Sequence, residues 1–518
     1  MVVFGFQLLL TITVLSFLNK VSFKYSFAQW LLTKGGLIRY LHPTNDQLKE
    51  AIAQQNKIDN RGSTVSANTS INNRKHRRRS HRQMIDRNNK QETFHVPKNL
   101  ILALDCEPLN VIDLVRLPYY NELQWVIDFS LSAVMIYFIT ELYYHFFSIF
   151  GPIKEYNLSI IWCLLSLSFV IKILCSLTAI YFRGEESIGE RSICILSFCT
   201  YLIVAMIILI ADEEMLEFGL INAYHSFQQN AYRFLQSQGV IETSPGPSSF
   251  LVIKFWIAII CGIIGALFAF PGLRLAQMHF DILIYSKENK LSLLLYHFSF
   301  ICPLFIILAW IKPLSRHYLV NKNLMSDEAF ESCRLWLILV VLVVRLCLFR
   351  RYLQTYLNIA PQKINCMKKQ AGKITNVDVQ KLIARVGHYL NVVSLQYLSP
   401  LLLCLFMTLI TKSTGNYKWM EPLIPNISNI GNLEINSPYE TMNRASNDSS
   451  NSSIFQDSIN EKRPRDVAKL TLTMLWDVFN PIVLRAINGF LLWWSCMVWF
   501  TTSVVGFLYN TYFRESSV

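Results

Sequence analysis

The chain has 518 residues, of which 52% are hydrophobic and 16% are charged, whereas roughly a quarter of the residues in a soluble globular domain are charged. The apolar residues form unbroken runs of roughly 20 residues, the length that spans the hydrocarbon core of a bilayer. This composition excludes a soluble globular protein, and the unbroken runs exclude a β-barrel, whose strands alternate in hydrophobicity. Because a spanning segment must satisfy its own backbone hydrogen bonds, we predict an all-α, polytopic helical membrane protein.

Nine apolar runs are candidates for transmembrane helices, or eight if the first is not a stable span. No Lys or Arg precedes the first run, whereas Lys20, Lys24 and Lys34 follow it, which favours an uncleaved anchor with its N-terminus outside. In chain order, the runs cover residues 2–18, 124–147, 158–181, 193–211, 251–271, 292–312, 335–349, 386–411 and 485–509.

The loop charges predict the same orientation. The loop 350–385 carries eight Lys and Arg residues against one acid, Asp378, and therefore belongs in the cytosol. The opposite side receives the acidic loop 212–250 and the Asn/Ser-rich loop 412–484. The second of these holds three N-x-[ST] sequons, which predict glycosylation at Asn426, Asn447 and Asn451.

These assignments divide the chain into five parts. An N-terminal anchor helix (1–18) precedes a basic, partly disordered cytosolic loop (19–123), and the membrane bundle follows (124–411). The polar luminal or extracellular loop (412–484) leads to the last membrane helix and a short cytosolic tail (485–518). Within the bundle we expect cytosolic amphipathic helices near 273–286 and 376–385, the second begun by a Thr375–Asp378 capping box.

Basic residues gather in the first cytosolic loop. The run "RKHRRRSHR" at Arg74–Arg82 is typical of a segment that binds anionic lipid headgroups, or of a solvated charge run. It has no interleaved aromatic residues, so we expect no nucleic acid partner. The 12 cysteines contain no C-x-x-C pair, and we predict neither a disulfide framework nor a metal or cofactor site.

Ionisable residues inside the apolar runs are costly and mark candidate sites. Asp128 and Lys172 lie at similar depths on consecutive runs and could form an ion pair, or each could reach the interface alone. Arg345 lies near a run's end and is expected to extend its side chain to the interface. In the eighth run, the polar residues His388, Asn391 and Gln396 predict hydrogen bonds between helices.

Glu141 lies in the other half of the bilayer, in "YFITELYYHFF". It shares one helical face with Tyr137 and Tyr144, and His145 lies one turn away. Such a stripe could bind a cation or relay a proton, or it could be a satisfied polar contact between helices.

The stretch "FPGLRLAQMHFD" follows an apolar run. We expect Pro271 and Gly272 to break the helix, and Arg274, Gln277 and Asp281 to form one polar stripe on the helix that follows. The stripe could be a solvated rim. We favour a structural lock against the helix begun by Thr375, with Phe280 and Ile284 facing inward.

Several long motifs resemble those of the transmembrane protein 161 family, over nearly the whole chain. They are "WLLTKGGLIRYLHPT" (30–44), "ITELYYHF" (139–146), "NLSIIWCLLSLSFVIK" (157–172), "GERSIC" (189–194), "EFGL" (217–220), "FPGLRLAQMH" (270–279) and "MKKQAGKITNVDVQKLIARV" (367–386). The run at 74–82 and the loop after Lys412 depart from the family pattern and look like insertions. The resemblance implies a glycosylated multi-pass protein associated with the control of ion currents, calcium homeostasis and cardiac rhythm. It brings no catalytic residues, ligand or transport substrate.

No hydrolase, metalloprotease, P-loop or dinucleotide-binding motif is present, so we predict that the chain is not an enzyme. The first hypothesis is a protein of the plasma membrane or endoplasmic reticulum that modulates calcium and potassium currents by binding channels or pumps. The alternative is a transporter or channel that uses Glu141, Asp128 and Lys172. Transport would require these charges to line a wet cavity, whereas modulation would leave them paired.

Overall fold

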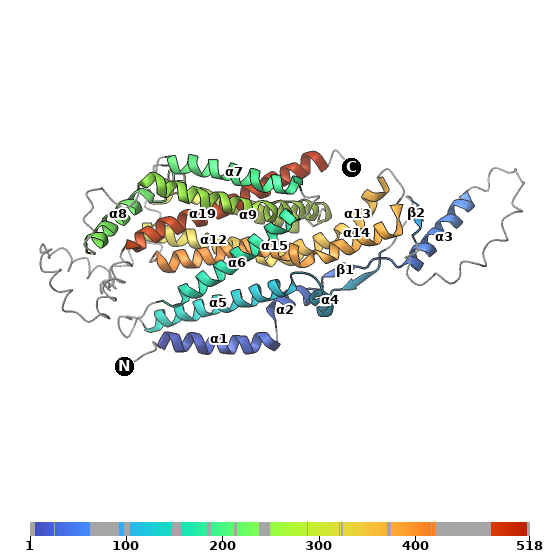
Figure 1. Ribbon diagram of the computed structural model, residues 1–518, viewed down its shortest axis with the longest axis horizontal. Helices are drawn as coiled ribbons and strands as arrows, with labels where there is room; N and C mark the ends of the chain where they lie inside the picture. Colours follow the sequence, from blue (N-terminus) through green and yellow to red (C-terminus); the bar gives the residue numbers. More distant parts are fainter. Residues whose placement is uncertain are drawn as a thin grey trace, which may run out of the picture. The chain divides into compact units, whose positions relative to one another are not determined.

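The computed structural model divides the chain into two compact units, which are described separately (Figure 1). The first comprises Met1–Phe23, Val126–Leu348 and Gln396–Val518, and the second comprises Lys24–Trp125 and Phe349–Leu395. The structure describes residues 6–24, 26–62, 93–97, 104–147, 157–183, 188–211, 215–237, 249–286, 289–320, 322, 325–369, 374–415, 417, 419 and 478–514.

The first unit is a bundle of long helices. Its elements are α1 (Phe6–Lys24), α5 (Tyr120–Phe147), α6 (Ser159–Arg183), α7 (Ile188–Ile210), α8 (Leu220–Ser237), α9 (Phe250–Tyr285), α10 (Lys290–Ala309), α11 (Arg316–Leu319), α12 (Asp327–Leu357), α15 (Leu390–Thr414), α19 (Pro481–Tyr509) and the π-helix η2 (Asn510–Arg514). Of these, α1, α5, α12 and α15 contribute residues to both units, α1 only through Lys24.

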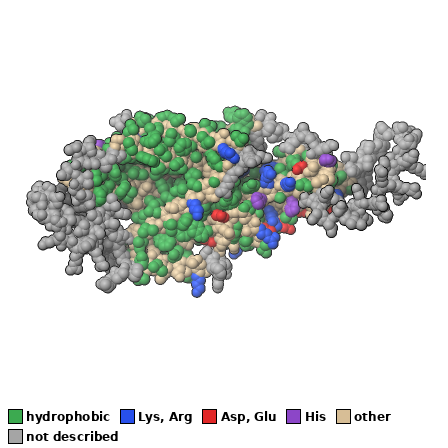
Figure 2. All heavy atoms as spheres, viewed as in Figure 1, with side chains coloured by type: hydrophobic (Ala, Val, Ile, Leu, Met, Phe, Trp, Pro, Cys, Tyr) green, Lys and Arg blue, Asp and Glu red, His purple; other side chains and the backbone are tan. Residues whose placement is uncertain are grey.

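Eight helices in the described part of the chain are long and apolar enough to cross a membrane. A ninth apolar helix, Gln7–Val21, is shorter. Large apolar side chains are exposed along these helices, for example Ile207 on α7 and Trp256 on α9, as expected for surfaces in contact with lipid. Hydrophobic side chains cover the bundle over α7 and α9 on the face drawn in Figure 2. The prediction of an all-α polytopic membrane protein is confirmed.

The helices α7, α9 and α19 pack closely because small residues occur where they cross. A Cβ atom at Gly265 on α9 would overlap the ring of Tyr201 on α7. On the other side of α9, a Cβ atom at Gly272 would overlap Thr502 on α19. Glycine therefore allows α9 to approach both neighbours at distances that any side chain would prevent.

The predicted break at Pro271–Gly272 is wrong, because α9 runs without interruption through Pro271. A proline removes one backbone hydrogen bond, but neighbouring helices can compensate for that loss inside a membrane bundle. Pro271 and Gly272 are both buried in this helix. Gly272 marks a close contact between helices and not the end of one.

The second unit is built around short strands and amphipathic helices. Its elements are α2 (Phe27–Thr33), β1 (Ile38–Tyr40), α3 (Asn45–Gly62), β2 (His95–Val96), β3 (Cys106–Pro108), α4 (Val111–Val115), α13 (Ile359–Lys369), β4 (Ile374–Thr375) and α14 (Asn376–His388). Two antiparallel pairs join distant parts of the chain, with Arg39 opposite Glu107 in β1–β3 and His95 opposite Thr375 in β2–β4.

The start of α14 confirms the predicted capping box. The Thr375 side chain accepts a hydrogen bond from the Asp378 backbone N–H, and the Asp378 carboxylate accepts one from the Thr375 backbone. These hydrogen bonds and the nearby Lys381 lower the pKa of Asp378, with the Thr375 side chain contributing most. The carboxylate therefore stays ionised at neutral pH and favours the helix N-terminus.

Candidate functional site

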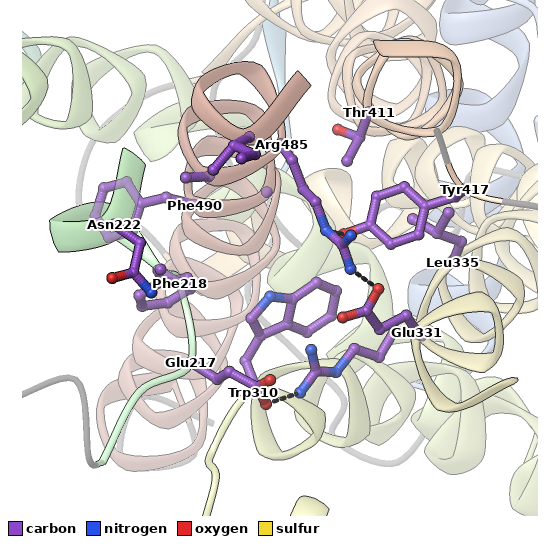
Figure 3. A pocket seen from close by; sticks show the side chains of 15 residues that line it. Glu217, Phe218, Asn222, Trp310, Glu331, Leu335, Thr411, Tyr417, Arg485 and Phe490 are labelled. Atoms are coloured by element: carbon purple, nitrogen blue, oxygen red, sulfur yellow. Dashed lines mark hydrogen bonds and ion pairs between the residues drawn. The ribbon is translucent and has the colours of Figure 1, made fainter. Parts of the chain in front are cut away.

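A cavity of about 320 Å³ lies in the first unit, where several helices begin or end (Figure 3). Its walls come from the segment after α7, the start of α8, the end of α10, the first turns of α12 and α19, and the segment after α15. In an antiparallel bundle these termini fall at one end. Aromatic side chains such as Trp310 and Tyr417 line it, as is typical of residues near a membrane–water interface.

Glu217 anchors the first group of charges in the cavity wall. Its carboxylate forms ion pairs with Arg316 and with Arg334, where the Arg334 Nη2–Glu217 Oε2 distance is 2.7 Å. Arg316 also pairs with Asp327 at 2.6 Å. These contacts join the segment after α7 to α11 and to the first turns of α12.

Arg334 is the most enclosed of these side chains, with 8% exposed. Its Nε donates at 3.1 Å to the Ala309 carbonyl oxygen at the end of α10, which also accepts from the Ser315 hydroxyl. Its guanidinium lies 4.3 Å from the ring centre of Phe330 and 5.2 Å from that of Trp310. Packing, cation–π contacts and hydrogen bonds thus hold this charge in one orientation.

Arg485 and Glu331 form the second group. Arg485 extends from α19 between Tyr417 and Glu331, and its guanidinium forms an ion pair with the Glu331 carboxylate (Figure 3). Its Nε donates to the Tyr417 hydroxyl at 2.9 Å, and its guanidinium lies 4.3 Å from the centre of that ring. Burial raises the pKa of Tyr417 to about 12, against the opposing effect of Arg334, so the phenol keeps its proton at neutral pH.

The sequence does not single out these residues, because charges at the ends of apolar runs are common. Glu331 and Arg334 lie within four residues of the start of the predicted run 335–349, and Arg485 begins the run 485–509. Glu217 lies within the "EFGL" motif, which is the one signal that pointed to this region. The sequence does not show which of these charges form ion pairs, because the paired positions are up to 154 residues apart (331 to 485).

Glu141, predicted as a site residue, forms an ion pair with Lys412 across α5 and α15. The two side chains are 21% and 12% exposed. The Ser413 Oγ donates to the Tyr137 hydroxyl at 3.4 Å on the same contact. The helices meet through a cluster that includes Ala133, Tyr137, Cys163 and Phe406.

Within the predicted stripe, Tyr137 keeps a side-chain hydrogen bond with Glu141, whereas the other members make different contacts. Tyr144 accepts a hydrogen bond from Gln7 on α1 at 3.4 Å. His145 is exposed beside Phe146, and in the described residues it forms no hydrogen bond with Glu141. Among the described residues no group of three His, Cys, Asp or Glu side chains is placed to hold a metal ion. The arrangement suits a polar contact between helices better than a cation site.

The chain matches the family model described as predicted transmembrane protein 161AB over residues 2–514. It belongs to this family. No solved structure matches the chain. The family match agrees with the multi-pass architecture and places every residue of the cavity inside the matched region.

The predicted ion pair between Asp128 and Lys172 does not form in the described structure of this family member. Asp128 is half-buried on α5, whereas Lys172 is exposed on α6. The aromatic contacts of Phe129 with Trp162 and Phe169 show that α5 and α6 are neighbours. Lys172 lies nine residues after the buried Cys163, which places it on the opposite face of α6 at 100° per residue.

Arg345 was predicted to reach the interface, and this is wrong. The residue is only 2% exposed, and its guanidinium lies 3.9 Å from the ring centre of Trp499 on α19. The Tyr397 hydroxyl donates to the Arg345 carbonyl oxygen at 2.7 Å, which joins α15 to the same place. Counting residues from a helix end predicts how deep a residue lies but not which side of the helix carries it. The side of α12 that carries Arg345 is turned toward other helices.

Two of the three polar residues of the eighth run form the predicted contacts. Gln396 donates to the Tyr181 hydroxyl on α6 at 2.7 Å. In the second unit, Asn391 donates to the carbonyl oxygens of Leu114 and Pro118. The predicted hydrogen bonding between distant segments is confirmed for these two residues.

The stripe on α9 is only partly as expected. Arg274 Nη1 donates to Gln277 Oε1 at 3.0 Å, and Asp281 is fully buried, which agrees with a lock and not with a solvated rim. Ile284, predicted to face the bilayer interior, is 43% exposed, and its placement toward lipid stays a prediction. The buried face of α9 contains Asp281, because the helix continues from the bundle without a break. The expected docking on the helix begun by Thr375 stays a prediction.

The sequons at Asn426, Asn447 and Asn451 and the basic run at Arg74–Arg82 lie outside the described residues. Their roles in glycosylation and in binding anionic headgroups stay predictions.

Proposed function

We propose that this integral membrane protein is not an enzyme and that it modulates calcium and potassium currents by binding channels or pumps. The link to ion currents and rhythm rests on the family resemblance. The observation that carries the mechanism is the state of the charges inside the bundle. Glu141 is paired with Lys412, and Arg345 is stacked on Trp499.

Paired charges favour modulation over transport on energetic grounds. An isolated charge at the centre of a spanning helix costs roughly 2.5–3.5 kcal/mol on insertion scales. Pairing with an opposite charge lowers this cost, so a paired charge can serve a structural role alone. A permeation path needs charges that face water along the bundle. Glu141 and Arg345 do not line the cavity of the first unit, which lies at helix ends.

The lipid-facing surface offers a route to partners. Within a bilayer, helices associate through packing and polar contacts and not through the hydrophobic effect. Exposed side chains on α7, α9 and α10, such as Ile203, Trp256 and Leu294, form the surface that a channel or pump subunit would meet. Both the plasma membrane and the endoplasmic reticulum contain such partners.

The test is to remove the protein from excitable cells and to re-express it while calcium and potassium currents are recorded. We expect re-expression to restore current amplitude or gating. A re-expressed Trp256→Ala variant, changed on the exposed face of α9, should restore it less than Lys290→Gln, a control at the exposed N-terminus of α10. Currents that do not differ between cells with and without the protein would remove the basis of the proposal.

A further inference from the structure

The cavity at the ends of the first unit's helices has the composition of a binding site. Glu217, Glu331, Arg334 and Arg485 are the charged side chains that line it, and the space between them is about 320 Å³. One water molecule takes up about 30 Å³ of the liquid, so the cavity has room for a polar group of roughly ten non-hydrogen atoms. That is the size of a small solute or of a lipid headgroup.

The charges of the site balance. Glu217 pairs with Arg334 and with Arg316, and Arg316 also pairs with Asp327. Together with the Glu331–Arg485 pair, three carboxylates face three guanidinium groups. A simple anion would add net negative charge and compete with the carboxylates for the arginines. A simple cation would compete in the opposite sense. A zwitterion keeps the site neutral, because each of its charges meets one of opposite sign.

The arginines are held in place and keep hydrogen-bonding capacity. In the described structure, the hydrogen bonds of Arg334 use Nε and Nη2, and those of Arg485 use the same two nitrogens. The Nη1 group of each arginine therefore has donors left for a ligand, and a planar guanidinium suits carboxylate or phosphate oxygens. Because the ion pair of Glu331 uses Oε2, its Oε1 is available to attract a cationic group.

The aromatic walls suit the cationic end of such a ligand. Phe218 and Phe490 lie edge to face with ring centres 4.9 Å apart, and both line the cavity. Trp310 lies in the same wall. Aromatic faces attract ammonium groups, including quaternary ammonium. The protonated Tyr417 phenol accepts from Arg485 and still has its own hydrogen to donate to an anionic oxygen.

We propose that this cavity binds a zwitterion with a phosphate or carboxylate at the Arg334–Arg485 side and an ammonium group near Glu331 and the aromatic wall. A phospholipid headgroup and a free zwitterionic solute share this chemistry. The inference does not depend on the proposed effect on ion currents, since it rests on the cavity alone.

The experiment uses the purified full chain in a neutral maltoside detergent and follows thermal unfolding by tryptophan fluorescence. Four probes are titrated: dihexanoylphosphatidylcholine, glycerophosphocholine, choline and inorganic phosphate. The lipid is kept below its critical micelle concentration. We expect saturable stabilisation by at least one of the two zwitterions and at least tenfold weaker effects of choline and phosphate. Stabilisation by the short-chain lipid alone identifies a lipid headgroup, and equal stabilisation by glycerophosphocholine identifies a soluble zwitterion.

Variants locate the binding. Glu331→Gln and Arg485→Gln should each weaken zwitterion binding at least tenfold, whereas Arg485→Lys should retain part of it because the charge remains. The matched control is Lys290→Gln, an exposed charge at the N-terminus of α10, the opposite end of that helix from the cavity, which should bind as the wild type does. If the Gln variants fail to fold, the inference is tested by the wild type alone, from its selectivity for the zwitterions over choline and phosphate. No stabilisation by either zwitterion, equal stabilisation by phosphate or choline, or unchanged binding in a folded Glu331→Gln variant would overturn the inference.

Discussion

Glu141 on α5 and Lys412 on α15 form an ion pair between two helices of the bundle, although 271 residues separate them in the chain. Both side chains are largely enclosed, and Lys412 also lies 5.5 Å from the ring centre of Trp419. In this pair, a charge in one apolar segment is neutralised by an opposite charge on a helix that is distant in the sequence.

Removing one partner of this pair should be worse than removing both. Breaking a buried ion pair on one side costs about 3–5 kcal/mol, because the remaining charge has no counterpart, whereas replacing both charges is often neutral. The partial exposure of both side chains places the expected loss at or below the lower end of that range. We expect Glu141→Gln and Lys412→Met each to lower the amount of folded protein, and the double variant to recover most of it.

Fluorescence-detected size-exclusion chromatography after heating measures this difference. If the double variant is no more abundant or heat-stable than the weaker single variant, the two residues do not act as a pair.

The close approach of α9 to α19 should be intolerant of even one methyl group at Gly272. A Cβ atom there would overlap Thr502, and overpacking in a well-packed core costs about 1–3 kcal/mol. We expect Gly272→Ala to lower the thermal midpoint. Gly189→Ala on α7 is the matched control, since its Cβ would meet nothing within 4 Å. Equal midpoints for the two variants would show that α9 and α19 do not approach as described.

Trp499 should stabilise the bundle by more than the burial of its apolar surface alone, because the Arg345 guanidinium lies 3.9 Å from the centre of its ring. A desolvated cation–π contact contributes about 2 kcal/mol or more. Trp499→Leu should therefore lower stability by more than Trp499→Phe, which keeps an aromatic face. Trp256→Leu on the exposed face of α9 should change little. Thermal unfolding of the three variants measures the order, and a Leu variant as stable as the Phe variant would contradict the contact.

Glycan mapping tests the predicted orientation of the chain. Asn68 also stands in an N-x-[ST] sequon, and the predicted orientation places it in the cytosol. Glycan should therefore be present at one or more of Asn426, Asn447 and Asn451 and absent from Asn68. Removal of N-glycans followed by peptide mass spectrometry identifies the occupied sites. Glycan at Asn68 would reverse the predicted topology.

The helical, multi-pass fold follows from the sequence because lipid imposes the length and polarity of each span. The α14 capping box was also predictable, since it depends on residues three positions apart. The contacts that define the candidate sites were not. The surroundings of Lys172 and Arg345 depend on which face each helix turns to the bundle, and the position of a residue along a run does not give that face.

Pro271 illustrates the limit of local rules in a different way. In water, Pro–Gly is typical of a helix end, but α9 continues because α7 and α19 enclose it. The cavity charges show the same dependence on tertiary structure. Glu331 and Arg485 each look like an ordinary interface residue, and only the packing of α12 against the start of α19 brings them into one site.

The most direct test of the central claim is a voltage-clamp recording from cells that express the protein, made first with the endogenous calcium and potassium channels active and then with both blocked. The account predicts that the protein changes the amplitude or gating of the channel currents and adds no current after the block. A current that requires the protein, persists with the channels blocked and is lost in Glu141→Gln would contradict it, because the intramembrane charge would then conduct ions itself.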